Sequence, residues 1–153
     1  MVDKGGMPED KQLGTREQGS RTHDAKCRSV RKGDDIAERL LWLGAQVLKQ
    51  MPNLEKTPGA KNVARQLERC ATAGGANYEE ARGAESPGDF VHKVRVALKE
   101  LRETGYWLKR LMRADLVDDV DCFQRMIHET GELIAILTAS ANTARRRART
   151  GDR

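Results

Sequence analysis

Residues 74–111 read GGANYEEARGAESPGDFVHKVRVALKELRETGYWLKRL, and their pattern is the clearest indication of how the chain folds. Gly83 suits the position just after a helix end. Ser86, Pro87 and Asp89 have the spacing of a helix start, with Ser86 as N-cap, Pro87 in the first turn and Asp89 as the third helical residue. The stretch therefore predicts two helices joined by a short turn.

The residues after this turn predict one long amphipathic helix. Apolar or small side chains recur every three or four residues, which is the period of a helix with one face in a core. About 25 such residues would span close to 38 Å at 1.5 Å per residue. The expected inner row is Phe90, Val94, Ala97, Leu101, Thr104, Leu108 and Leu111.

The helix before the turn is predicted to begin at Thr57 and Pro58, a hydroxyl N-cap followed by proline. Because a glycine costs a helix interior about 1 kcal/mol relative to alanine, the pair Gly74 and Gly75 indicates close approach of a neighbouring backbone or, alternatively, of a ligand. The expected inner row is Ala60, Val63, Leu67, Cys70, Gly74, Asn77 and Ala81.

Two further helices flank this pair. The first is expected to begin at Asp34 or Asp35, with Asp35 as N-cap and Glu38 reaching back to it, and to stop at Pro52. The last is expected to begin with the cap spacing of Asp118 and Asp121 and to fray at residues 145–149. Their apolar rows are Ile36, Leu40, Leu43 and Val47, widened by Leu41 and Leu48, and Val120, Phe123, Ile127, Thr130, Ile134, Leu137 and Ala141.

Four such helices with short connections predict an all-α, antiparallel up-down-up-down four-helix bundle over residues 34–144. Residues 1–33 lack an apolar period and are predicted to be a disordered basic N-terminal tail. Residues 145–153 are predicted to be a basic C-terminal tail. The whole chain has a net charge of +5, but residues 34–141 carry 15 basic and 17 acidic residues, so the basicity is concentrated in the two tails.

Composition excludes several classes of protein. No apolar run approaches the roughly 18 residues of a membrane span, and the first residues lack the apolar core of a signal peptide. Cys27, Cys70 and Cys122 are far apart and have neither the C-x-x-C spacing of a zinc site nor the pattern of a disulfide framework. We therefore expect a cytoplasmic protein with reduced thiols, without membrane contact or cofactor.

The central stretch also carries a resemblance. The pattern A-N-Y-E-E-A-R-G-A-E-S-x-x-D-F-x-H-K, followed by A-L-K-E-x-R-E-T-x-Y-W-L, is similar to the bacterial four helix bundle protein family. That family is related to proteins encoded within intervening sequences of large-subunit ribosomal RNA genes. The resemblance covers about residues 40–145. It implies a four-helix bundle without known enzyme activity that assembles into cyclic homopentamers. A more distant similarity is to the accessory protein of diversity-generating retroelements, a basic pentamer that binds nucleic acid and a reverse transcriptase.

Polar residues at the end of the second helix and along the third are expected to lie near each other. A structural interpretation is a network that fixes helix register or pairs subunits across an interface, because a buried amide such as that of Asn77 must find partners. Trp107 suits either such an interface or a second core layer. The residues are Asn77, Tyr78, Glu79, Glu80, Asp89, His92, Lys93, Lys99, Glu100, Glu103 and Trp107.

The alternative is a carboxylate-bridged di-metal site, for which helical bundles use paired Glu-x-x-His motifs. Asp89 and His92 form one shortened copy, whereas His128 has Arg125 three residues before it, so the second copy fails. No nucleophile with a matching base and no glycine-rich phosphate loop is present either. We therefore expect no catalytic residue, no metal ligand and no small-molecule substrate.

The C-terminal arginines can attract phosphates through charge alone, although a solvated helix end is the simpler interpretation. These arginines are Arg145, Arg146, Arg147 and Arg149. The sequence thus predicts a non-enzymatic protein that self-associates, with contact to RNA or DNA through its basic tails. A purely structural or protein-interaction subunit is the second hypothesis, and the metal-binding bundle is the third.

Overall fold

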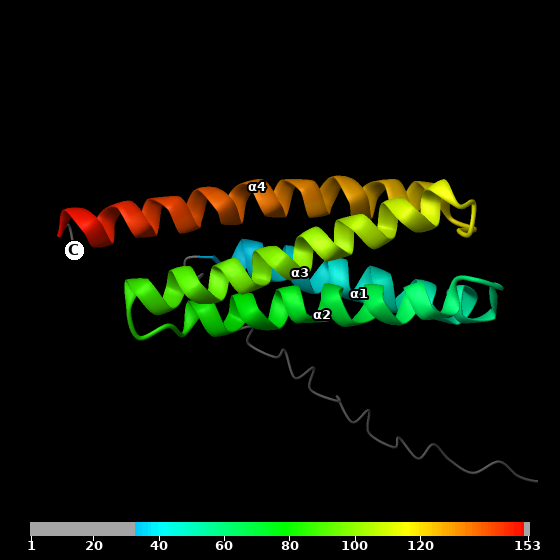
Figure 1. Cartoon of the computed structure of the whole chain (residues 1–153), viewed down its shortest axis with the longest axis horizontal. Coiled ribbons are helices and arrows are strands. Elements are labelled where there is room, and N and C mark those ends of the chain that lie inside the picture. Colours follow the sequence, from blue (N-terminus) through cyan, green and yellow to red (C-terminus); the bar gives the residue numbers. More distant parts are fainter. Residues whose placement is uncertain (1–32, 152–153) are drawn as a thin grey trace, which may run out of the picture.

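The computed structural model describes residues 33–151 of the chain. It holds the helices α1 (Asp34–Lys56), α2 (Lys61–Arg82), α3 (Pro87–Arg113) and α4 (Val120–Thr150) and no strand (Figure 1). The predicted all-α class is confirmed. The expectation of disorder for the N-terminal tail lies outside the described residues, apart from Gly33.

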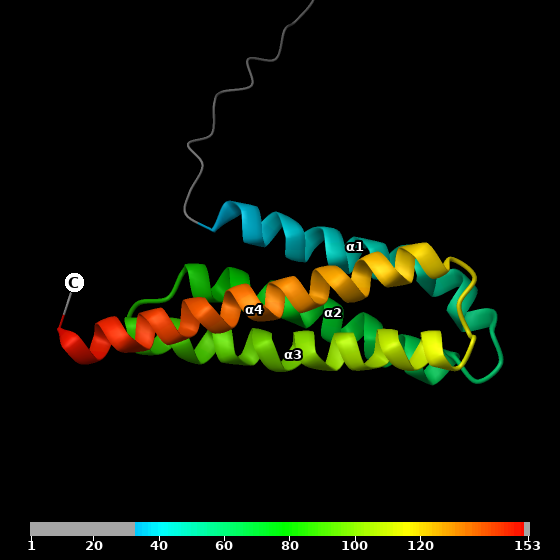
Figure 2. The same cartoon turned by 90° about the horizontal axis from the view of Figure 1, so that it is seen from above.

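The helices alternate in direction and pack as a four-helix bundle. Each helix contacts its neighbours along the chain, and α1 also contacts α4, which closes the bundle. The α1 and α3 helices therefore lie across the core from each other, as do α2 and α4 (Figure 2). The pair α1 and α2 forms one side of the molecule, and the pair α3 and α4 forms the opposite side.

The core follows the period seen in the sequence of α3. Thr104 and Thr130 are its buried polar side chains, and each hydroxyl donates to a carbonyl one turn earlier, Glu100 O at 2.9 Å and Met126 O at 2.7 Å. The expected inner row of α3 is buried except for Phe90, which is half-buried. The largest fully buried side chains are Phe123, Leu40, Leu43, Leu67, Leu101, Leu108, Leu111, Met126, Leu133, Leu137, Val47 and Val94.

The inner row of α2 differs from the prediction at two places. Ala64 and Tyr78 are buried, whereas Val63 and Asn77 are only half-buried. Over the length of α2 the buried face follows the 3.6-residue period of a helix, so a choice between adjacent residues from spacing alone can miss by one position. Asn77 consequently needs no buried partner.

The predicted capping box of α1 is wrong. The helix begins at Asp34 after Gly33, which has φ +89°, and no side chain of residues 33–151 caps the first turn. The carbonyl of Gly33 accepts the hydrogen bond from Ala37 N at 3.0 Å, and the Asp34 carboxylate pairs with Arg82 of α2. A glycine takes the left-handed conformation without the strain that a Cβ would cause, so the N-cap is Gly33, two residues before the expected Asp35, while the helix start at Asp34 agrees with the earlier of the two expected starts.

The predicted boundary between α1 and α2 is also wrong. The α1 helix continues through Pro52 to Lys56, because the exposed proline lies on the solvent side while Met51 and Leu54 are buried. Thr57 then ends α1, since its hydroxyl donates to Asn53 O at 2.9 Å, instead of capping α2. The gain from burying Leu54 outweighs the backbone hydrogen bond that proline cannot donate.

The N-terminal caps of α3 and α4 follow the expected chemistry more closely. The Ser86 hydroxyl accepts from Asp89 N at 3.1 Å, which confirms the predicted cap of α3. The cap of α4 is Asp119 instead of Asp118, and its carboxylate accepts from Cys122 N at 2.9 Å. The α4 helix also runs on to Thr150, beyond the point where we expected it to fray, and Gly151 ends it at φ +68°.

Two glycines mark close approaches between helices. A Cβ at Gly74 would lie 3.4 Å from the Leu101 side chain and 3.9 Å from Ala97 O, so α2 and α3 meet here. The closest neighbour is thus a side chain instead of the expected backbone. A Cβ at Gly105 would lie 3.4 Å from Thr130 Cγ2, which places these two residues opposite each other where α3 packs against α4.

Candidate functional site

Arg69, which sequence reasoning missed, organises part of the predicted polar cluster. It extends from α2 to two carboxylates of α3, with Nη1 3.2 Å from Glu100 Oε2 and Nη2 2.8 Å from Glu103 Oε1. Trp107 Nε1 donates to the same Glu103 oxygen at 3.1 Å. These hydrogen bonds, that of Trp107 first, hold the pKa of the Glu103 carboxyl below its usual value.

Trp107 lies at the edge between the core and the solvent. Its half-buried indole packs against the core cluster, and the ring of Tyr106 stands edge-on to it at 4.8 Å. The guanidinium of Arg110 lies 5.5 Å from the indole centroid, within reach of a cation–π contact. The indole is thus anchored within one subunit, and its role in an interface stays a prediction.

A second bridge joins α2 to α3 nearer the turn. Lys93 Nζ lies 3.4 Å from Glu80 Oε2. Glu79 instead binds Arg82 of its own helix at 2.7 Å, and Arg82 also pairs with Asp34 of α1. The expected single network is therefore divided into two separate bridges between α2 and α3 and a third between α1 and α2.

Five of the predicted residues, Asn77, Tyr78, Asp89, His92 and Lys99, belong to none of these bridges. Asn77 donates to Ala73 O of its own helix at 2.8 Å. Tyr78 is only 5% exposed and fills the core, and burial raises the pKa of its phenol. Lys99 is exposed on the solvent side of α3. The burial of Tyr78 fits its position four residues after Gly74, because residues four apart lie on the same face of a helix.

Asp89 and His92, the residues of the metal alternative, do not come together with further ligands. Asp89 lies in the first turn of α3, and its backbone N–H donates to the Ser86 cap, while His92 is exposed one turn later. Within residues 33–151, no group of three His, Cys, Asp or Glu side chains gathers in a way that could hold a metal ion.

An apolar groove lies on the outer side of α1 and α2. Its volume is about 970 Å³, and Leu41 and Leu48 stand in it with 66% and 51% of their surface exposed. Sequence reasoning had assigned these two leucines to a widened core face. Small residues of both helices, among them Gly44 and Gly75, also line it, and the charged residues Asp34, Glu38, Glu79 and Arg82 line the end where α1 begins. The sequence signal for this groove was the width of the apolar row of α1, which exceeds what one neighbouring helix can cover.

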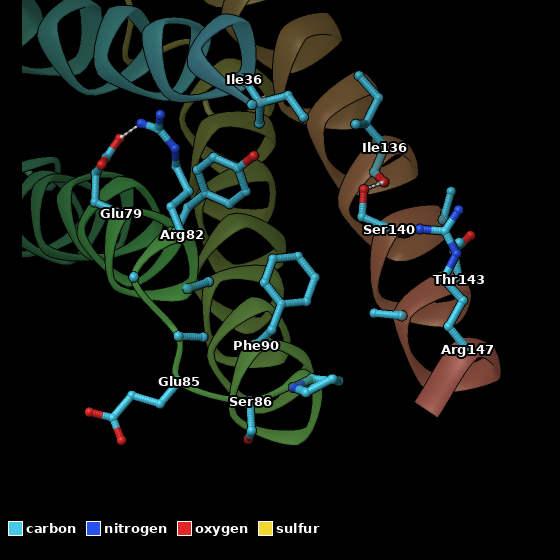
Figure 3. Close-up of a pocket in the computed structure, with 18 of the residues that line it drawn as sticks. Ile36, Glu79, Arg82, Glu85, Ser86, Phe90, Ile136, Ser140, Thr143 and Arg147 are labelled. Carbon is cyan, nitrogen blue, oxygen red and sulfur yellow. Dashed lines mark hydrogen bonds and ion pairs between the residues drawn. The ribbon is translucent and has the colours of Figure 1, made fainter. Parts of the chain in front are cut away.

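A second groove, of about 1110 Å³, lies at the end of the bundle where α1 begins (Figure 3). Phe90 of α3 points into it, and Ile36 of α1 and Ile136 of α4 line the part of the groove that its ring faces. The polar groups at its rim are largely satisfied, since Arg82 pairs with Glu79 and the Ser140 hydroxyl donates to Ile136 O at 3.0 Å. The only basic lining residue without an ion pair among the described residues is Arg147.

The four predicted arginines are all exposed near the end of α4. None of them makes an ion pair with a described carboxylate. Arg145, Arg146 and Arg149 share one face with Asn142 and Thr150, while Arg147 turns towards the end groove and Gly88. Because α4 stays helical here, these charges are held on a regular surface instead of a flexible tail.

Comparison with known proteins agrees with this architecture. The protein family described as 23S rRNA-intervening sequence protein matches residues 36–139. A solved structure of a protein with unknown function from the S23 ribosomal protein family of Bacteroides thetaiotaomicron VPI-5482 is 26% identical, covers 69% of this chain and 97% of its own, and superposes with a TM-score of 0.64. No curated protein matches the chain. No helix among the described residues is long and apolar enough to cross a membrane.

Proposed function

Since the chain belongs to the 23S rRNA-intervening sequence protein family, whose role is not known, we propose that it is a non-enzymatic helical bundle that self-associates and contacts nucleic acid through the basic end of α4. The exposed apolar groove on α1 and α2 is the observation that carries this proposal. A ring of identical subunits is the assembly we expect, and the family resemblance favours five.

Self-association is supported by the two leucines of the groove. Single exposed apolar residues are common on protein surfaces, but Leu41 and Leu48 lie two turns apart on one helix and share a groove with small residues. A Cβ at Gly44 would lie 3.9 Å from Ala71 O and one at Gly75 would lie 3.7 Å from Leu40 Cβ, so the glycines bring α1 and α2 of one chain together beneath the leucines. A second copy of the chain would remove both leucines from water and gain the hydrophobic free energy of their burial.

Contact with nucleic acid is supported by the arginines of α4. Four guanidinium groups within five residues, all exposed and without ion pairs to described carboxylates, create a concentrated positive potential. Each can neutralise one phosphate and release a counterion. The description of the family names the 23S rRNA intervening sequence, so RNA is the first nucleic acid to test.

The absence of catalysis is also part of the proposal. Its support is that Asp89 and His92, one helical turn apart at the start of α3, have no third His, Cys, Asp or Glu side chain gathered with them among the described residues. Metal analysis of the purified protein tests the alternative directly. Stoichiometric iron or manganese would replace this proposal by a metal-dependent bundle.

The test is the absolute mass from light scattering on a sizing column, with absorbance at 260 and 280 nm recorded at low and high salt. Five subunits of 17.1 kDa would give about 86 kDa, and a single subunit 17.1 kDa. Excess absorbance at 260 nm that disappears at high salt would indicate bound nucleic acid. A monomer at all concentrations would refute self-association, and protein free of nucleic acid that also fails to bind added RNA would refute the second half.

A further inference from the structure

One face of α3 carries a row of cations that the charge totals conceal. Arg95, Lys99, Arg102, Lys109 and Arg113 follow one another at intervals of four, three, seven and four residues, and Tyr106 fills the seven-residue gap. This spacing places all six side chains on one side of the helix. All six are exposed, and none of the five cations makes an ion pair with a described carboxylate.

The carboxylates of α3 lie elsewhere on the helix. Glu100 and Glu103 face α2, where Arg69 binds both, and Asp89 lies in the first turn. The nearly balanced charge of the bundle is therefore segregated: acidic and basic residues neutralise each other between helices, while the outer row of α3 stays purely basic. Net charge cannot reveal this separation, because it sums over all faces.

The row lies on the side of α3 that borders α4. Gly105 is the point where α3 meets Thr130 of α4, and Arg102 and Lys109 stand three residues before and four residues after it. Residues at these intervals are surface neighbours on a helix. The cations therefore lie along the outward seam of α3 and α4.

The adjoining face of α4 begins with one carboxylate, Asp121 in the first turn, and ends in arginines. Glu129 and Glu132 turn to the opposite flank, where both pair with Arg39 of α1, at 2.5 and 3.5 Å. After Asp121, the residues that share the exposed flank next to α3 are Gln124, His128, Gly131, Ala135, Asn142, Arg145 and Arg149, at helical intervals of three, four and seven.

The two rows join because the helices are antiparallel. Gly105 lies opposite Thr130, and Gly88 lies in the same groove as Arg147, so the α4 arginines follow Arg95 in space. At 1.5 Å per residue the path from Arg113 through this crossing to Arg149 is about 40 Å long. Next to Arg113 the path ends at the acidic turn between α3 and α4, which contains Asp115, Asp118 and Asp119.

We propose that this basic track, Arg95, Lys99, Arg102, Tyr106, Lys109, Arg113, Arg145 and Arg149, binds a single strand of nucleic acid. The inference rests on the proposed contact with nucleic acid and extends it from the end of α4 to the whole seam. The seven cations follow the phosphates of the strand. Tyr106, which is 56% exposed, offers its ring to an unpaired base, and such stacking tolerates any base.

The salt dependence of binding tests the cations. Anisotropy of a labelled single-stranded RNA of about 20 nucleotides is titrated with the full chain at several salt concentrations. Seven phosphate contacts predict a slope of log K against log salt of about −5. The variant Arg95→Gln/Arg102→Gln/Lys109→Gln should reduce its magnitude by about 2. A matched control, Lys56→Gln/Lys61→Gln/Arg65→Gln, removes three exposed charges from α1 and α2 and should leave the slope unchanged.

A substitution of Tyr106 tests whether the bound nucleic acid is single-stranded or a duplex. Tyr106→Ala should weaken binding of the single strand by about 5- to 150-fold with the salt slope unchanged. It should not affect binding of a duplex of equal length. All the changed side chains are exposed, so the variants should fold normally. Thermal melting of each variant checks this.

The outcomes separate this inference from the proposed function. Equal losses in the α3 variant and in the α1/α2 control would overturn the track, since charge alone would then explain binding. Full binding by the α3 variant, with loss only in Arg145→Gln/Arg149→Gln, would also overturn it while leaving the proposed contact through α4 intact. A duplex bound as tightly as the single strand, with no effect of Tyr106→Ala, would refute the single-strand assignment. No binding of any nucleic acid by the unaltered chain would refute both proposals together.

Discussion

Replacing Leu41 and Leu48 by glutamine should weaken self-association without unfolding the bundle. Both side chains stand in the α1/α2 groove with most or half of their surface exposed in the isolated subunit. They contribute little to the core, which is built from Leu40, Leu43 and Val47 on the next positions of the helix. Exposed substitutions of this kind usually change the free energy of unfolding by less than about 0.5 kcal/mol each.

The magnitude follows from the exposed fractions. Full burial of a leucine side chain is worth about 1.5–3 kcal/mol. An interface that covers the remaining 66% of Leu41 and 51% of Leu48 would therefore gain about 2–3.5 kcal/mol from the two residues together. Since a tenfold change corresponds to about 1.4 kcal/mol, the dissociation constant should rise by about 30- to 300-fold.

The assay is sedimentation or light scattering over a range of protein concentrations, for the unaltered chain, the double variant and a control. Val120→Gln is the matched control, because Val120 is 46% exposed at the start of α4, away from the groove. An unchanged dissociation constant for the double variant, with normal thermal melting, would refute the groove as the interface. A loss of the same size in Val120→Gln would show that the effect is not specific to the groove.

Three further predictions concern the bundle itself. Gly131→Ala should raise the free energy of unfolding by about 0.5–1 kcal/mol in urea titrations, because Gly131 lies inside α4 and the Cβ of an alanine there would have open space around it, with no neighbouring atom within 4 Å; a loss of stability would contradict this. Leu101→Ala should lower it by about 2–5 kcal/mol in the same titrations, because the side chain is fully buried, and a cost below about 1 kcal/mol would mean that the core collapses around the gap. In carbon-13 NMR titrations, Glu103 should stay charged below the ordinary carboxyl pKa of about 4.3, because its hydrogen bonds lower the pKa in the folded state. The resulting stabilisation is fully present above about pH 4.3 and is lost as the pH falls through the lowered, folded-state pKa. Trp107→Phe should raise the pKa of Glu103, and an unchanged value would assign the shift to Arg69 alone.

The fold could be predicted because it depends on periodicity, which a sequence displays directly. The inner row of α3 and the Ser86 cap follow from spacing, and both are present. The helix ends were harder, because a local signal competes with burial. Pro52 should stop a helix by its missing N–H, yet the burial of Leu54 in the next turn carries α1 past it. Such contests are decided by tertiary packing, which the local pattern does not contain.

The candidate sites could be predicted only in composition. Glu100, Glu103 and Trp107 were expected in one cluster, but the residue that joins them is Arg69, whose long side chain crosses from a neighbouring helix. A spacing rule compares residues within one helix and cannot identify a partner on the next. For the same reason Leu41 and Leu48 were counted as core, because their exposure depends on how much of α1 its two neighbours cover.

The position of the two proposed surfaces gives them a joint consequence. The groove belongs to α1 and α2 and the basic track to α3 and α4, which form opposite sides of the bundle. A second copy seated in the groove would leave the track open, so an assembly would present several tracks at once. A strand long enough to engage two tracks would bind the second in an intramolecular step, which raises apparent affinity by about 10²- to 10⁴-fold. The double variant at Leu41 and Leu48 should therefore bind a short oligonucleotide as the unaltered chain does, and lose affinity only for a long one. Equal affinities of the assembled chain for short and long strands would show instead that one strand cannot reach two tracks of the assembly.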